Sequence, residues 1–462
     1  MPELDVTADE LVSALLTLAK SEAVCILDSC GVGYLGSHLL IAGIDPVKTY
    51  EFTETTAAET LSFIDEKLAG NLASVFTISY DFGMKMLGIA SRTKPLESPP
   101  EPDVFLALFD VLVVHDYETG VTCILGNGDK FHSVRDKLKA NISNLNSEIS
   151  HAEPAIKSNF TRAAYVEAIE RVKECIRAGN TYQTNLTQQL TVPLPDGLTG
   201  EQIFARLRRD NRAPFSAFIK RLDSTVVSSS PERFFKIDHS QAHSDERSSI
   251  AGRCSITTSP IKGTRRRGQN AAENDNLKLE LLNSSKDRAE NIMIVDLLRN
   301  DLGRICEYGT VRVEKLCSLE EHPTLFHLVS TVTGDLRPDA AISDILKAVF
   351  PCGSITGAPK ISTMQIIDEI EPSNRGLSMG AIGIYVPSPK SEMSTLNFGL
   401  GTLNSGIDLA VAIRTMVIRH DIATFNVGGG VVIDSDPESE YQETLVKAEA
   451  LRKALGASLN GL

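Results

Sequence analysis

The sequence predicts an α+β protein in which layered antiparallel β-sheets are flanked by helices. Short apolar runs bounded by turn residues recur along the chain, which is typical of buried strands. Amphipathic segments long enough for helices also occur, but strands and helices do not alternate regularly. Regular alternation would indicate a parallel, doubly wound sheet, so the observed order favours the layered α+β class.

The first 150 residues contain several apolar segments that predict strands. These segments are residues 23–28, 74–79, 105–116 and 122–126. A helix is expected over about 133–149, and residues 151–160 are expected to form a linker. We therefore divide the chain into an N-terminal region, 1–150, and a catalytic region, 161–462, and we expect the two to interleave in one compact body.

The second region begins with a helix signal, because Thr161 can cap a helix that stops at Gly179. Further helices are expected over 286–303 and 437–455, and the polar residues 237–258 are expected to form a long hairpin excursion. The expected strands are 184–192, 215–220, 225–230, 380–386, 409–418 and 422–433.

The composition excludes several classes of function. The chain has 46 Lys and Arg against 60 Asp and Glu, a net charge of −14, which argues against nucleic-acid and membrane-surface binding. A small anionic substrate is still compatible, because a local pocket can be basic within an acidic protein. Eight cysteines without a Cys-x-x-Cys pair, and an N-terminus without a signal peptide, predict reduced thiols in a cytoplasmic protein.

Two of the predicted helices carry acids three residues apart. One has Asp287 and Glu290, and the other has Glu440 and Glu443. Residues at i and i+3 share a helix face, so two such helices facing each other would form an all-oxygen site suited to Mg²⁺. The alternative is that each pair lies on a solvated face, which is the usual place for charged residues.

Two other short segments allow both a structural and a chemical interpretation. The glycines 428–430 either form a tight bend or let backbone N–H groups approach an anion. Lys262 lies between Pro260-Ile261 and Gly263, in a segment that continues with three arginines. It is either a solvated turn residue or an amine that acts on a substrate.

A set of motifs between residues 160 and 455 resembles, in order, the chorismate-utilising enzymes. Residues 1–150 resemble the N-terminal region of the large subunits of this family more loosely. The motifs are PERFF at 231–235, PIKGT at 260–264, AENIMIVDLLRNDLGR at 289–304, HLVSTVTG at 327–334, GSITGAPK at 353–360, AIRT at 412–415 and VGGGVVIDSDPESEYQET at 427–444.

The PIKGT motif resembles the family branch that aminates chorismate for para-aminobenzoate and folate biosynthesis. Anthranilate-forming members usually have alanine in place of Lys262. The resemblance implies that Lys262 attacks C2 of chorismate and expels the C4 hydroxyl, after which ammonia adds at C4 and releases the lysine. This chemistry needs a neutral amine, which the arginines 265–267 could favour electrostatically. Glu232 matches the general acid for the departing hydroxyl, a role that needs a raised pKa.

The resemblance also implies a metal site and a set of groups that hold the substrate. Glu290 and Glu443 match Mg²⁺ ligands, with Glu440 and Asp287 acting through waters. The positions that match substrate-binding groups are Arg414, Tyr385, Lys447, His327 and the backbone at Gly428 and Gly430.

The expected nucleophile is ammonia rather than water. Water-using members of the family carry a water-activating lysine where this chain has Gln183, and an amide cannot act as a base at neutral pH. Because ammonia is mostly protonated at that pH, and the chain has no Gly-x-Cys-x-Gly nucleophile elbow, we expect a separate glutamine amidotransferase subunit.

Some features leave alternatives open. Residues 26–29 resemble the edge of the family's tryptophan pocket, and Cys352 replaces the glycine that usually precedes GSITGAPK. Ser259 before Pro260 is closer to the anthranilate synthase version of the motif. Anthranilate synthase component I is therefore the second hypothesis, and a non-catalytic subunit that binds an aromatic metabolite is the third.

Overall fold

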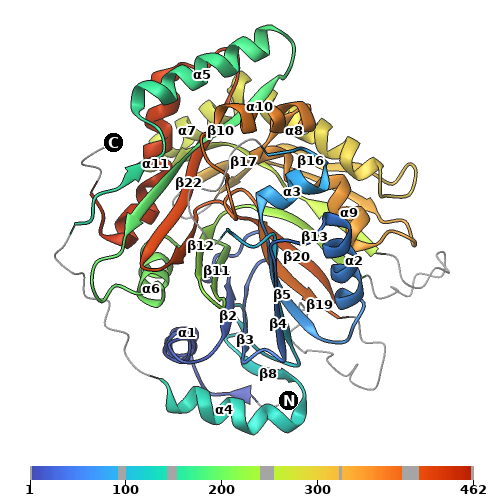
Figure 1. Cartoon of the computed structure of the whole chain (residues 1–462), viewed down its shortest axis with the longest axis vertical. Coiled ribbons are helices and arrows are strands. Elements are labelled where there is room, and N and C mark those ends of the chain that lie inside the picture. Colours follow the sequence, from blue (N-terminus) through green and yellow to red (C-terminus); the bar gives the residue numbers. More distant parts are fainter. Residues whose placement is uncertain are drawn as a thin grey trace.

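Two large antiparallel β-sheets dominate the computed structural model, in which all pairings between named strands are antiparallel (Figure 1). The structure describes residues 3–91, 100–142, 153–239, 254–321, 325–387 and 405–458. Three expected segments lie partly outside the described residues. The missing parts are the middle of the hairpin 237–258, the C-terminal part of the helix 133–149 and the start of the linker 151–160.

The first sheet has twelve strands. In spatial order they are β1 (Glu3–Leu4), β8 (Thr122–Gly126), β7 (Val111–Asp116), β3 (Leu39–Ile44), β2 (Val24–Asp28), β11 (Phe215–Lys220), β12 (Thr225–Ser230), β21 (Thr415–Arg419), β22 (Ile422–Val431), β10 (Gln183–Pro193) and β18 (Gly357–Ala358), with β9 (Lys157–Ser158) beside β10. Strands from the first 126 residues therefore pair with strands from the later part of the chain, at β2 and β11.

The second sheet has ten strands and is mixed in the same way, because β5 pairs with β19. In spatial order the strands are β15 (Ile261–Arg266), β17 (Leu325–Asp335), β14 (Cys254–Thr258), β13 (Arg233–His239), β20 (Gly406–Val411), β19 (Ala381–Val386), β5 (Ala73–Ile78), β6 (Val104–Phe109) and β4 (Lys48–Phe52), with β16 (Arg312–Glu321) beside β17.

The sheets pack face to face, and helices cover their outer faces. One core cluster joins apolar side chains of both sheets, such as Ile41 and Ala217 with Phe105 and Ile384. Helices α1 (Ala8–Leu18), α4 (Phe131–Ala140), α6 (Gly200–Asp210) and α11 (Pro437–Leu455) share a second cluster with the first sheet. Helices α2 (Ala57–Leu68), α3 (Tyr80–Met86), α8 (Ser285–Gly303), α9 (Ile342–Val349) and α10 (Lys360–Ile370) share a third with the second sheet.

The expected α+β class and several expected elements are confirmed. Thr161 accepts a hydrogen bond of 3.2 Å from the N–H of Ala164 and so caps α5 (Arg162–Arg177), which packs against α11. Helix α8 lies within one residue of its expected start, and α11 has the expected bounds. Helix α7 (Ala271–Asn283) covers β15 and β17, and short 3₁₀ turns η1 (Gly128–Lys130) and η2 (Gly353–Ile355) complete the described elements.

The prediction of one continuous strand is wrong for two segments. Residues 105–116 divide at Asp110 into β6 and β7, and residues 409–418 divide into β20 and β21. In each case the two parts belong to different sheets, so an uninterrupted apolar run hides a crossing between them. Arg414, at the second crossing, has a φ of 48°, a left-handed conformation that ends β20 and redirects the chain.

The link from β20 to β21, which contains Arg414, lies beside another link that crosses between the sheets. This other link joins β12 to β13 and contains Glu232. Hydrogen bonds join the two links: the N–H of Val411 donates to Glu232 O at 3.0 Å, and the N–H of Ser229 donates to Arg414 O at 3.0 Å. The fold therefore places Glu232 and Arg414 on adjacent backbone segments where the two sheets meet.

All eight cysteines are free thiols. Among the described residues, no helix is both long enough and apolar enough to cross a membrane.

Candidate active site

Ser354 connects the lysine and the acid that the sequence singled out. Lys262, on β15, donates from Nζ to the backbone oxygen of Ser354 at 3.4 Å. The hydroxyl of Ser354 donates to Oε1 of Glu232 at 2.8 Å. One residue of η2 thus holds Lys262 and Glu232 on the same side of the second sheet, and Lys262 is half-buried rather than extended into solvent.

The environment of Glu232 favours the protonated form of its carboxyl group. The residue is buried, and burial raises its pKa above the usual range. The Ser354 hydroxyl, the positive charge of Lys262 and the N–H of Ile261 oppose that rise without cancelling it. The raised pKa that a general acid needs is therefore present.

Cys352 fills the space behind this pair. Its Sγ lies 3.3 Å from Oγ of Ser354, and burial, together with the negative charge of Glu232, raises its pKa to about 12. A thiol with such a pKa is neutral and unreactive at physiological pH. The cysteine that replaces the expected glycine therefore acts as an apolar packing group and does not add a nucleophile.

The structure brings together the acids expected on the two helices. Burial raises the pKa of Glu290, on α8, and the negative charges of Asp287 and Glu440 raise it further, against the opposing charges of Lys262 and Lys286. Glu440, on α11, is buried and accepts a hydrogen bond of 2.7 Å from the Ser435 hydroxyl. Carboxylates from two helices thus share one electrostatic environment beside Lys262.

Lysines partly neutralise this acidic group. Nζ of Lys447 lies 2.8 Å from Oε1 of Glu443, and Nζ of Lys286 lies 3.9 Å from Oε1 of Glu440. Burial alone raises the pKa of Glu443, but the charges of Lys447, Lys286 and Lys262 bring it below the usual range. The lysines therefore favour the ionised form of Glu443 and place cations around the acidic group.

These acids fit a hard cation such as Mg²⁺, which takes oxygen ligands and keeps several waters. Within the described chain, the oxygens of Glu290, Glu440 and Glu443 do not all lie within 4.8 Å of one another, so the acids do not form a closed cage. Asp287 is less available, because its Oδ2 lies 3.2 Å from Nη2 of Arg265.

Arg414 is a cation without a counter-ion among the described residues, on the backbone link next to the one that contains Glu232. Burial lowers its pKa, and the charge of Arg266 lowers it further. In the described part of the chain, its guanidinium makes no hydrogen bond or ion pair. A guanidinium that is desolvated in this way favours binding of a carboxylate, since its paired N–H groups match two carboxylate oxygens.

The three glycines near the end of β22 provide backbone donors. Asn185 and Thr187, opposite Gly430 and Gly428 on β10, donate their N–H groups to Thr356 and Glu371 instead of β22. In an antiparallel ladder the residues opposite must then direct their own N–H groups away from β10. The carbonyl of Gly428 points the same way, because it accepts a hydrogen bond of 2.8 Å from Lys447 Nζ.

The glycines are also required sterically. A Cβ on Gly429 would lie 3.1 Å from Oε2 of Glu440, and one on Gly430 would lie 2.1 Å from Nε2 of Gln183. Gln183 is buried beneath this strand, and its Oε1 has no hydrogen-bond partner among the described residues. The site thus keeps the glycine backbone open on one side and the Gln183 amide below it.

His327 and Tyr385 differ in their position relative to Lys262. His327, on β17, is buried, and its Nδ1 lies 2.9 Å from Oγ1 of Thr264, two residues after Lys262. Tyr385 pairs with Ser74 and Ile407 and lies four residues along β19 from Ala381, about 13 Å at the strand rise. Among the described residues, no hydrogen bond or ion pair joins Tyr385 to the groups described above.

The three arginines after Lys262 do not surround its amine. Arg265 Nε lies 2.8 Å from Oε1 of Glu280, and Arg267 lies over the ring of Phe326. Arg266 is exposed, and its charge acts on Arg414. The expectation that these arginines favour a neutral Lys262 is therefore not supported, and carboxylates are its nearest charged neighbours.

Three contributors were missed from the sequence. Ser354 lay in the GSITGAPK motif without a role, although its hydroxyl and carbonyl hold Glu232 and Lys262. Lys286 lies one turn before Glu290, and this i, i+4 spacing is a signal that was available. Gly429 was passed over in favour of its neighbours, although it faces Glu440 and Lys447.

The fold and this site define a chorismate-binding enzyme. The chain belongs to the chorismate binding enzyme family, whose model matches residues 36–453. It is 36% identical to aminodeoxychorismate synthase component 1 of Escherichia coli over 356 residues, which are 77% of this chain and 71% of that protein. It is 33% identical to anthranilate synthase component 1 of Aquifex aeolicus over 78% of this chain and 71% of that protein.

Some relatives are longer than this chain. The match to aminodeoxychorismate synthase of Streptomyces griseus is 34% identical and covers 91% of this chain but 57% of that protein. Among solved structures, anthranilate synthase component I of Streptococcus pneumoniae superposes with a TM-score of 0.72 at 24% identity, over 91% of this chain and 93% of the other. The last likeness supports the expected anthranilate synthase-like fold.

Proposed function

We propose that this chain aminates chorismate at C4 to give 4-amino-4-deoxychorismate, the precursor of para-aminobenzoate in folate biosynthesis. The carrying observation is the Lys262–Ser354–Glu232 arrangement, which places a primary amine beside a buried carboxyl group with a raised pKa. The relatives named aminodeoxychorismate synthase support the same reaction. The second candidate is anthranilate synthase, which the relative from Aquifex aeolicus keeps open.

In the proposed reaction, the Lys262 amine forms a bond to C2 as the two conjugated double bonds of the ring shift and the C4–O bond breaks. Glu232 gives its proton to the departing oxygen, which leaves as water. Ammonia then bonds to C4, the double bonds shift back, and the C2–N bond to Lys262 breaks.

Two sets of groups would hold the substrate. Arg414 supplies a guanidinium without a counter-ion, and Gly428 and Gly430 supply N–H groups that point away from β10. Glu290 and Glu443 would hold Mg²⁺, with Glu440 acting through water, and the ion would neutralise a substrate carboxylate. These assignments, and those of Lys447, His327 and Tyr385, are part of the proposal.

Ammonia would come from a glutamine amidotransferase subunit, since the chain has no glutamine-hydrolysing elbow. With glutamine as the nitrogen source, the chain alone is expected to be inactive, whereas ammonium salts at alkaline pH support turnover. Glutaminase activity in the pure chain would contradict the need for a partner. The eight free thiols are consistent with a cytoplasmic enzyme.

The pocket between the two sheets is a candidate for the tryptophan site implied by residues 26–29. Leu27, Asp28 and Ser29 line it together with Phe215 and Ile384. Since the chain has no tryptophan, the emission of added tryptophan can be excited selectively, and a saturable change on titration would demonstrate binding. A linear response would contradict a regulatory site.

The test of the reaction is single-turnover product analysis of Lys262→Ala with chorismate, ammonium and Mg²⁺. Loss of the nucleophile should reduce 4-amino product by orders of magnitude, whereas a solvated loop lysine would change the rate by a factor equivalent to about 0.5 kcal/mol. Lys262→Arg is the matched control, because arginine keeps the charge but cannot act as a neutral amine. Undiminished product in either variant would show that Lys262 is not the nucleophile.

A further inference from the structure

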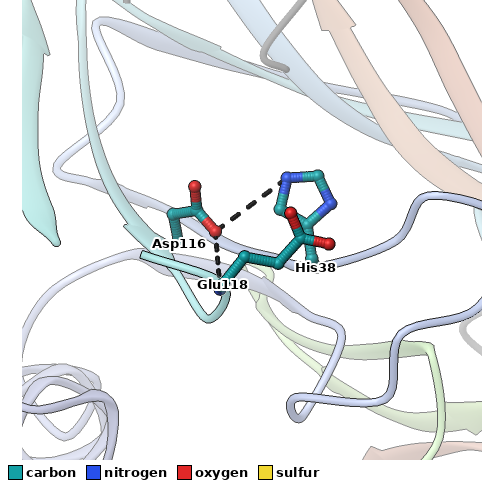
Figure 2. Close-up of side chains that lie close together, drawn as sticks. All are labelled: His38, Asp116 and Glu118. Carbon is teal, nitrogen blue, oxygen red and sulfur yellow. Dashed lines mark hydrogen bonds and ion pairs between the residues drawn. The ribbon is translucent and has the colours of Figure 1, made fainter. Parts of the chain in front are cut away.

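A group of potential metal ligands outside the site described above lies at the β7–β8 hairpin of the first sheet. It consists of His38, just before β3, Asp116, the last residue of β7, and Glu118, in the turn that follows. One ligand atom from each residue lies within 4.8 Å of the other two, and Figure 2 shows the three side chains close together. Among the described residues, this is the one His/Cys/Asp/Glu trio so closely spaced.

The backbone fixes the positions of these ligands. Asp116 pairs with Leu39 in the β3–β7 ladder, and the N–H of Tyr117 donates to His38 O at 2.9 Å. The N–H of Glu118 donates to Oδ1 of Asp116 at 2.8 Å, which closes the turn around the aspartate (Figure 2). Asp116 is therefore held at the end of β7 and His38 directly before β3, and Glu118 follows within a turn that Asp116 stabilises.

The orientation of His38 suits a metal ligand. Its Nδ1 lies 2.9 Å from the carbonyl oxygen of Gly36, and because a carbonyl only accepts, Nδ1 carries the hydrogen. In the neutral ring, Nε2 is then the basic nitrogen, and it faces Asp116, with 3.9 Å between Nε2 and Oδ1. Metal-bound histidines are commonly oriented in this way, with the second ring nitrogen donating to a carbonyl.

We propose that His38, Asp116 and Glu118 bind a divalent transition-metal ion of the zinc type, which ties the β7–β8 turn to the start of β3. One imidazole nitrogen and two carboxylates neutralise a 2+ ion and match the donors that zinc accepts at about 2.0–2.2 Å. Glu118 is exposed, so its side chain can close the remaining distance and a water can complete the coordination. The all-oxygen acids on α8 and α11 suit Mg²⁺ instead.

The ion would act on structure rather than on the amination. His38, with Gly36 and Ser37, lines the pocket between the two sheets, so a metal at this point holds one rim of that pocket. Binding to the folded chain raises thermal stability by mass action. The site and its role do not depend on the proposed reaction.

The test is calorimetric titration of the full chain with Zn²⁺ in saturating Mg²⁺, followed by thermal unfolding. We expect one zinc per chain and a higher unfolding temperature. Glu118→Gln removes one charge from an exposed, nearly isosteric side chain, so the fold is retained while zinc affinity falls at least about tenfold. His132→Gln, on the exposed face of α4, is the matched control and should bind zinc like wild type.

Two further measurements complete the test. His38→Gln should also lose zinc binding, and Co²⁺ should give a visible absorption spectrum in wild type that both variants lose. Glu443→Gln should keep the single zinc, because its carboxylate belongs to the other group. Absence of zinc binding by wild type, or unchanged zinc affinity in Glu118→Gln, would overturn the proposal.

Discussion

The two halves of the active site are built in opposite ways. Lys262 and Glu232 lie on strands and links of the second sheet, and Ser354 fixes both through two hydrogen bonds. Glu290, Glu440 and Glu443 lie on two helices, with Glu440 buried and the other two at least partly exposed, and the charges of Lys286 and Lys447 oppose theirs. In the strand half burial raises the pKa of Glu232, whereas in the helix half nearby lysines bring the pKa of Glu443 below its usual range although burial raises that of Glu290.

This difference follows from the chemistry each half would perform. A general acid must hold a proton near neutral pH, and burial against few partners achieves that. A cation site must offer ionised oxygens that can rearrange around an ion and its waters. Variants in the strand half should therefore change the rate and its pH dependence, and variants in the helix half should change the metal requirement.

The largest effect expected in a comparison of the halves is that of Glu232→Gln. Loss of the proton donor should lower kcat by about 10²- to 10⁴-fold. The fold should be retained, because burial disfavours the carboxylate and the amide oxygen can still accept from Ser354. The measurement is kcat with ammonium, together with thermal unfolding.

The contribution of Glu232 to the pH dependence of stability has a defined direction. Since the pKa of Glu232 is raised in the folded protein, its stabilising contribution is present at low pH and is lost as pH rises through that pKa. Glu232→Gln should remove this dependence and should unfold no earlier than wild type at alkaline pH. A near-normal kcat would assign Glu232 a structural role only.

The second prediction concerns the helix half. Glu443→Gln removes one charge from a proposed ligand on an exposed helix face, so turnover should fall by about 100-fold or more at the Mg²⁺ concentration that saturates wild type. Excess Mg²⁺ should restore part of the rate, which it should not do for Glu232→Gln. Wild-type activity at saturating Mg²⁺ would show that the ligand assignment is wrong.

The two halves also differ in how much of their structure the sequence predicts. Acids at i and i+3 predicted a shared face on α8 and on α11, because helical spacing is local. The role of Ser354 depends on contacts with residues 92 and 122 positions away, which no local pattern contains. Arg265 lies three residues after Lys262, yet its side chain contacts Glu280 and Asp287. Side chains along a strand alternate between its two faces, so closeness in sequence does not bring them to one point.

The fold shows the same division. The cap at Thr161 and the bounds of α11 follow from local signals. The crossings between sheets at Asp110 and Arg414 do not, because an apolar run has the same composition whether it stays in one sheet or enters another. The left-handed conformation of Arg414 has no sequence signal, since it is imposed by the strands on either side.

The third prediction tests how Ser354 couples the strand half. Ser354→Ala removes the hydroxyl that lowers the pKa of Glu232, so that pKa should rise further. Because the general acid works in its protonated form, the alkaline limb of the rate–pH profile should move to higher pH. The carbonyl that accepts from Lys262 remains, so kcat at the optimum should fall by only about tenfold. An unchanged alkaline limb would show that the titration of Glu232 does not set this limb of the rate–pH profile.

The smallest effect should come from Lys286→Met, which removes a cation from the helix half without removing a ligand. Nζ of Lys286 lies 3.9 Å from Glu440 and its side chain is 57% exposed, so the interaction is screened and should contribute about 1 kcal/mol or less. A bound divalent ion competes with this lysine for the same carboxylates. Lys286→Met should therefore bind Mg²⁺ more tightly, by about two- to fivefold, in a calorimetric titration. Lys315→Met, on β16, is the matched control and should leave Mg²⁺ affinity unchanged. Weaker Mg²⁺ binding in Lys286→Met would mean that Lys286 orients the acids rather than competing with the ion, and the helix half would then be as rigidly organised as the strand half.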